Sequence, residues 1–86
     1  MARFERIIQR ILSGVSDRNF EFSEICAVLE RLGFSCRING SHHIFFREGI
    51  EEIINLQPKG GKAKAYQVKQ VRNIIVNYGL SSDHEE

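Results

Sequence analysis

The 86 residues are 42% hydrophobic and 27% charged with a single proline, a composition that suits one small folded domain and excludes disorder over most of the length. The formal net charge of +1 gives no global sign of a nucleic-acid-binding protein, and the two cysteines are too few for a disulfide scaffold and lack the spacing of a zinc site. No apolar run approaches the ~20 residues of a membrane span, and charged residues interrupt the N-terminus where a signal peptide would be apolar, so the expected location is the cytoplasm.

Two helices are predicted in the first part of the chain. Apolar residues recur at helical spacing between Phe4 and Leu12 and form one stripe. After a loop over residues 14–19, a second helix is expected to begin at Ser23 as N-cap and to end at Gly33. The apolar residues of its buried face would be Ile25, Val28, Leu29 and Leu32.

A strand and a tight turn follow the second helix. Phe34, Cys36 and Ile38 alternate with polar residues, which is the period of a half-buried strand. Asn39-Gly40 is a favoured pair for a two-residue type I′ turn, in which both residues take a positive φ angle. The sequence therefore predicts a hairpin at this point.

Two further strands and a last helix complete the predicted fold. One strand runs over residues 41–47, and the Glu48-Gly49 turn joins it to another over residues 50–56. Three strands joined by tight turns imply an antiparallel sheet. The final helix is marked by its apolar residues Val68, Val71, Ile74, Ile75 and Tyr78, and Gly79 ends it. The expected class is α+β, with helices packed on one face of the sheet.

Two histidines stand on the strand that leaves the first hairpin turn. His42 and His43 point to opposite faces of the sheet because they are adjacent on a strand. Imidazoles held at the mouth of a rigid hairpin are well placed for proton transfer, but they are equally consistent with ordinary half-buried strand residues. The third histidine, His84, lies in the polar tail over residues 81–86, where we expect disorder and no role for it.

Although the net charge is close to zero, one segment of the chain is locally basic. The segment from 59 to 72 contains no acidic residue, and its basic residues are Lys59, Lys62, Lys64, Lys69 and Arg72. This combination is suited to binding phosphate. Lysines supply positive charge, glycines let backbone N–H groups approach the ligand, and the start of a helix adds the positive end of its dipole. We expect residues 59–64 to form a flexible basic loop. The alternative to phosphate binding is an ordinary solvated surface loop. A Walker loop is excluded because its spacing and its Ser/Thr are missing.

The predicted core has the plan of the double-stranded RNA-binding domain, a module that reads A-form RNA through phosphates and 2′-hydroxyls. Three short motifs extend this likeness: Leu32-Gly33-Phe34, Gly40-Ser41-His42 and the segment from Lys62 to Leu80. With them the chain resembles the HicA family of toxins, small mRNA interferases of toxin–antitoxin pairs with a double-stranded RNA-binding-like fold. The resemblance covers roughly residues 22–80 of a domain expected over residues 1–80.

The resemblance implies cleavage of mRNA by a histidine that follows Gly-Ser, and a HicB-type antitoxin as inhibitor. The family's Gly-Ser-His falls on Gly40, Ser41 and His42, and some relatives hold the histidine one place later, at His43. We favour His42. The helix over residues 4–12 precedes the family core, and the sequence leaves open whether it completes the core, forms a dimer or contacts the antitoxin.

A histidine next to RNA suggests a mechanism that needs no metal and no cofactor. An imidazole takes up and returns protons near neutral pH, and the RNA 2′-hydroxyl is an internal nucleophile. With lysines stabilising the phosphorane, cleavage would leave a 2′,3′-cyclic phosphate. Two other interpretations remain, a non-catalytic RNA-binding module and a protein-interaction domain. A histidine metal site is the least favoured because adjacent strand histidines diverge.

Overall fold

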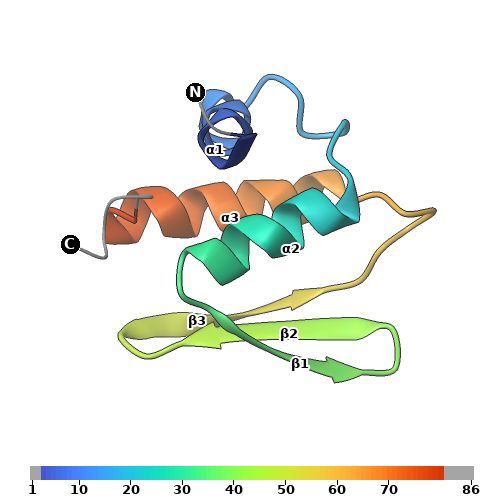
Figure 1. Ribbon diagram of the computed structural model, residues 1–86, viewed down its shortest axis with the longest axis vertical. Coiled ribbons are helices and arrows are strands. Elements are labelled where there is room, and N and C mark those ends of the chain that lie inside the picture. Colours follow the sequence, from blue (N-terminus) through green and yellow to red (C-terminus); the bar gives the residue numbers. More distant parts are fainter. Residues whose placement is uncertain (1–2, 81–86) are drawn as a thin grey trace.

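The computed structural model describes residues 3–80. They form three helices and a three-stranded sheet (Figure 1). The elements in chain order are α1 (Arg3–Ser13), α2 (Phe22–Arg31), β1 (Ser35–Asn39), β2 (His42–Arg47), β3 (Ile50–Leu56) and α3 (Ala65–Tyr78). The tail predicted to be disordered, residues 81–86 with His84, lies outside the described residues. None of the helices in the described part is long and apolar enough to cross a membrane.

The elements are stacked in three layers. The strands pair antiparallel in the order β1-β2-β3, with Cys36 opposite Phe45 and Phe45 opposite Ile54. Helices α2 and α3 cover one face of this sheet, and no helix or strand of residues 3–80 lies on the other face (Figure 1). The predicted α+β class and the double-stranded RNA-binding-like arrangement are therefore confirmed.

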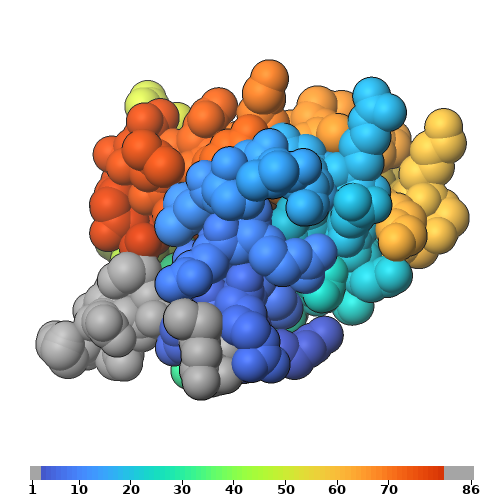
Figure 2. Space-filling model, turned by 90° about the horizontal axis from the view of Figure 1, so that it is seen from above, coloured from blue at the N-terminus to red at the C-terminus, as the bar shows by residue number. Residues whose placement is uncertain are grey.

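Helix α1 forms the third layer and completes the core. It lies across α2 and α3 on the side away from the sheet (Figures 1 and 2). Its apolar stripe is buried there through Phe4, Ile7 and Ile11, and Ile11 is fully shielded from solvent. The helix that precedes the family core thus supplies part of the hydrophobic interior, because α2 and α3 present apolar side chains on two sides rather than one.

Helix α2 begins two residues earlier than predicted. Glu21, not Ser23, occupies the N-cap, and its backbone N–H donates to Oε1 of Glu24 at 3.0 Å. Ser23 lies within the first turn. Gly33 ends the helix as expected, with a φ of 94° that favours glycine, and the N–H of Phe34 donates to the carbonyl of Leu29 at 3.0 Å.

The hairpin turn differs from the predicted type. Asn39 pairs with His42, so the two central residues are Gly40 and Ser41. Gly40 has a φ of 64°, and no non-glycine residue in the described part of the chain has a positive φ. A positive φ at the first central position alone is the pattern of a type II′ turn, which places glycine there. The prediction was wrong because the ladder continues through Asn39.

Strand β1 is exposed along its whole length, whereas the alternation predicted a half-buried strand. It is the edge strand of the sheet and lies farthest from α3, which packs on β3 (Figure 1). Cys36 and Ile38 do face the helix layer, since they pair with Phe45 and His43. The side chain of Ile38 nevertheless stays 63% exposed, because the layer does not close over this edge.

Candidate nucleic-acid interface

The two strand histidines lie on opposite faces of the sheet, as their adjacency predicts. His43 shares its face with buried Phe45 and points toward the helix layer. His42 points to the open face and is exposed. A single ligand therefore meets both rings only if it passes over the mouth of the hairpin.

The His42 ring is oriented by the neighbouring part of the sheet. Its Nδ1 lies 3.0 Å from Oδ1 of Asn55 on β3. An amide oxygen only accepts hydrogen bonds, so Nδ1 carries the proton in this arrangement. In the neutral ring the other nitrogen, Nε2, then has a free lone pair on an exposed side chain. This is the tautomer that a general base requires.

The His43 ring is held by packing. It meets the ring of Phe22, at the start of α2, edge-on with centroids 4.9 Å apart and an interplanar angle of 75°. Its Nδ1 is buried and has no hydrogen-bond partner within residues 3–80. His43 therefore has a packing contact with Phe22 and one buried polar atom without a partner in this range, and its side chain lines the space between α2 and the hairpin.

Hydrogen bonds join the hairpin turn to the start of α3. Gln57, just after β3, donates from Nε2 to Oγ of Ser41 at 2.9 Å. Gln67 donates from its own Nε2 to the Gln57 carbonyl at 3.4 Å, and its Oε1 accepts from the backbone N–H of Lys64 at 3.1 Å. Gln67 is only 1% exposed. The mouth of the hairpin and the N-terminus of α3 are thus held together.

Sequence reasoning missed the three amide side chains, Asn55, Gln57 and Gln67. Only Gln67 left a signal, because a glutamine three residues after the N-cap of a helix is typical of reciprocal capping. Asn55 and Gln57 act through partners on other elements, and no local pattern indicates them.

The basic loop is a compact turn and not the flexible segment that was predicted. Lys59 and Lys62 exchange two backbone hydrogen bonds of 2.9 and 3.0 Å around Gly60 and Gly61, whose φ angles of 59° and 78° are positive. The carbonyl of Gly61 accepts from the backbone N–H of Phe22 at 2.9 Å. The turn is therefore docked on the start of α2, at the same end of the molecule as the hairpin mouth (Figure 1).

The lysines differ in how much positive charge they present. The Nζ of Lys62 pairs with Oε2 of Glu21 at 3.2 Å, so part of its charge is compensated. Within the described part of the chain, Lys59, Lys64 and Lys69 form no ion pair. Lys59 and Lys69 are exposed and Lys64 is half-buried at the N-cap of α3. These three lysines carry the free charge of the segment.

Arg72 does not belong to this group, although it was predicted to bind RNA. Its guanidinium donates to both carboxylate oxygens of Asp17, at 2.9 and 3.2 Å, and to the carbonyl of Ile11 at 3.1 Å. The hydrogen bonds to Asp17 raise the pKa of Arg72. The side chain thus fastens the connection between α1 and α2 to α3, and three of its five N–H donors are used within the fold.

No group of three or more His, Cys, Asp or Glu side chains among residues 3–80 is arranged to hold a metal ion. The residues that come together at the hairpin end are instead an imidazole, amides, a hydroxyl and lysines. This set is suited to hydrogen bonding with phosphate and ribose and to proton transfer.

A comparison with protein families matches residues 22–76 to the family described as HicA toxin of bacterial toxin–antitoxin. The match extends from the first residue of α2 into α3 and covers more than half of the chain, including both histidines and the basic turn. No curated protein and no solved structure shows significant similarity to the chain.

Proposed function

The chain belongs to the HicA toxin family and is the toxin of a toxin–antitoxin pair, and from this premise we propose that it is an endoribonuclease that cleaves mRNA with His42 as general base. The observation that carries the proposal is the contact between Nδ1 of His42 and Oδ1 of Asn55. In the neutral imidazole this contact puts the proton on Nδ1 and leaves the lone pair on Nε2, at the end of the molecule where the basic turn lies. His43 is the weaker candidate because its ring is packed against Phe22.

The reaction uses the nucleophile of the substrate. Nε2 of His42 takes the proton of the 2′-hydroxyl, and the 2′-oxygen attacks the adjacent phosphorus. The bond from phosphorus to the 5′-oxygen breaks, and this oxygen leaves with a proton from the imidazolium or from water. The products are a 2′,3′-cyclic phosphate and a 5′-hydroxyl. Lys59, Lys64 and Lys69 stabilise the negative charge of the phosphorane and the flanking phosphates.

The backbone of the turn between β1 and β2 has a separate role. Gly40 lacks a side chain, and a Cβ at that position would meet no atom within 4 Å, so the turn is open to an approaching strand. Ser41 is held by Gln57 and places the turn relative to α3. These contacts support Gly40 and Ser41 as residues that lie against the RNA backbone.

The partner that restrains the toxin is, in this proposal, a HicB-type antitoxin in the cytoplasm. It would inhibit cleavage by covering the hairpin mouth and the basic turn, with acidic groups opposite the free lysines. Such charge complementarity would raise the association rate.

A non-catalytic RNA-binding module is the second candidate function, and the packed position of His43 favours it. One experiment separates the two. Purified protein is incubated in excess chelator with an RNA and with the same RNA carrying a single 2′-deoxyribose at the cut site. The proposal expects cleavage of the first to a 2′,3′-cyclic phosphate and none of the second. Cutting of the deoxy substrate, or loss of cutting in chelator, would contradict the mechanism.

A further inference from the structure

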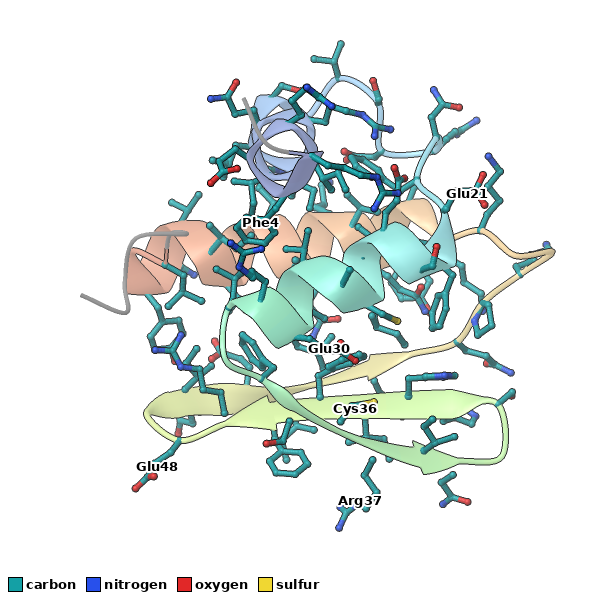
Figure 3. The ribbon with its side chains drawn as sticks, viewed as in Figure 1. Phe4, Glu21, Glu30, Cys36, Arg37 and Glu48 are labelled. Carbon is teal, nitrogen blue, oxygen red and sulfur yellow. The ribbon has the colours of Figure 1, made fainter. Side chains whose placement is uncertain are left out.

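A groove with a volume of about 520 Å³ separates α2 from the β1–β2 hairpin on the helix side of the sheet. Its walls come from α2 and from the first two strands, and the residues that matter here are Phe22, Cys26, Glu30, Cys36, Ile38 and His43. Figure 3 shows that Glu30 projects from α2 toward the sheet, where Cys36 lies opposite it. The groove exists because the helix layer does not close over the exposed edge strand.

Much of the wall is apolar, and the one carboxylate of the lining is a hydrogen-bond acceptor only. Ile38 is 63% exposed and Phe22 presents an aromatic ring. Among the lining residues there is no lysine or arginine. Glu30 supplies this carboxylate from an exposed side chain, and the His43 ring forms part of the wall. This chemistry does not suit phosphate. It suits a flat ring whose edge carries a donor.

The two thiols add no charge to the groove. Burial, together with the nearby Cys36 and Glu30, raises the pKa of Cys26 to about 11. Burial and Glu30 also raise the pKa of Cys36. Both side chains are therefore neutral near pH 7, and Glu30 is the one Asp, Glu, Lys or Arg among the lining residues.

The groove borders the surface proposed to bind RNA. The backbone N–H of Phe22 donates to Gly61, so the basic turn lies at one end of it. His42 and His43 are adjacent but project from opposite faces of the sheet. An RNA strand that passes over the mouth of the hairpin can therefore place one ribose at His42 and a neighbouring base in the groove on the other face.

We propose that this groove holds one unstacked nucleobase of the RNA, lying against Phe22 and Ile38 and donating from its exocyclic amino group to Glu30. The inference rests on the proposed function and adds to it a substrate class, single-stranded RNA with an amino-bearing base beside the cut. Adenine, cytosine and guanine fit, because each carries an exocyclic amino group that donates to a carboxylate. Uracil presents carbonyl oxygens on both sides of its one N–H, and these are repelled by the carboxylate.

The test measures binding without cleavage. Single-stranded oligonucleotides with 2′-O-methyl ribose throughout cannot supply the attacking hydroxyl, so 12-mers of adenosine, cytidine and uridine report affinity alone by fluorescence anisotropy. We expect adenosine and cytidine to bind about tenfold more tightly than uridine, the scale of one favourable base contact. Glu30→Gln should reduce this ratio to about threefold or less, since an amide also donates to uracil carbonyls.

Two variants control the result. Glu48→Gln makes the same chemical change on an exposed residue at the opposite end of the sheet and should leave the ratio unchanged (Figure 3). Phe22→Leu keeps an apolar side chain and removes the aromatic face, so all three oligonucleotides should bind about tenfold less tightly while the circular dichroism spectrum is retained. Equal affinities for the three oligonucleotides in the parent protein, or an equal effect of Glu30→Gln and Glu48→Gln, would overturn the inference.

The outcomes also separate the groove from the ribonuclease. If the protein binds the oligonucleotides in a base-dependent way but cuts no RNA, the base-binding groove is supported and the catalytic proposal is refuted. If the protein cleaves RNA but binds the three oligonucleotides equally, the catalytic proposal is supported and the proposal of a base in the groove is refuted. Failure to bind any of the oligonucleotides or natural RNA would refute both.

Discussion

The Nδ1 atom of His42 lies 3.0 Å from the Oδ1 atom of Asn55, and the two residues come from neighbouring strands of the sheet. Asn55 pairs with Ile44 in the ladder, so its side chain is on the same open face as His42. This relationship places the imidazole and selects its tautomer. It makes Asn55 a positioning residue for the proposed base, which sequence motifs do not indicate.

Asn55→Ala should lower kcat for RNA cleavage about tenfold or more with little change in KM, because the ring loses the acceptor that fixes its proton on Nδ1. Asn55→Asp keeps an oxygen at this position and should retain more activity than Asn55→Ala. Asn77→Ala removes a comparable exposed amide from α3 and serves as the control. Equal activity of Asn55→Ala and the parent in steady-state assays would exclude the positioning role.

His42→Ala should reduce ribonuclease activity by ~10²-fold or more, the usual scale for the loss of a general base, without unfolding the domain. His43→Ala should have a smaller effect on cleavage, because it removes a packing contact with Phe22 and leaves the proposed base in place. Cleavage rates and thermal unfolding of both variants and of the double variant measure this. If all three cut RNA at the parent rate, neither histidine is catalytic.

The free lysines should set the salt dependence of RNA binding. Each of Lys59→Ala, Lys64→Ala and Lys69→Ala should reduce the slope of log K against log salt by about 0.7, the value per phosphate contact for a single strand. Lys62→Ala should reduce it less, because Glu21 already compensates part of that charge. The slopes come from binding titrations at several salt concentrations. An unchanged slope in the triple variant would place the RNA elsewhere, for example across the open face of the sheet.

Arg72→Ala should destabilise the fold by about 2 kcal/mol, since it removes hydrogen bonds between charged groups and leaves Asp17 unpaired. The slope of RNA binding against salt should not change. Arg18→Ala removes an exposed arginine from the same connection and should alter stability by less than about 0.5 kcal/mol. Urea unfolding measures both variants. A flatter salt slope with unchanged stability in Arg72→Ala would restore this residue to the RNA interface.

The two thiols should react with iodoacetamide at different rates. A pKa raised to about 11 for Cys26, from the usual 9.0, makes its thiolate about a hundredfold scarcer at pH 8. Cys36 is exposed and should be alkylated first, while Cys26 is half-buried. Mass spectrometry of the intact protein and of Cys36→Ser follows the reaction, and unfolding in urea should abolish the difference. Faster alkylation of Cys26 than of Cys36 in the folded protein would contradict the structure of the groove.

The order of the elements and many of their ends are properties of the sequence itself. Gly33 and Gly79 end their helices because a residue with a positive φ follows the last turn, and this preference is local. The alternation of Ile54 and Leu56 identifies the buried face of β3, since both are fully buried. The separation of His42 and His43 onto opposite faces follows from strand geometry alone. The motifs between residues 22 and 80 likewise identified the family.

Only the tertiary structure decided which of these residues meet. The strand alternation of β1 predicted burial, but β1 lies at the edge, where no layer covers it. In the sequence Arg72 belongs to the basic segment, whereas in the fold its guanidinium pairs with Asp17, 55 positions away. The contact between His42 and Asn55 and the groove beside Glu30 also join separate elements. Local preferences depend on neighbours in the chain, whereas burial, charge compensation and ring orientation depend on residues that only folding brings together.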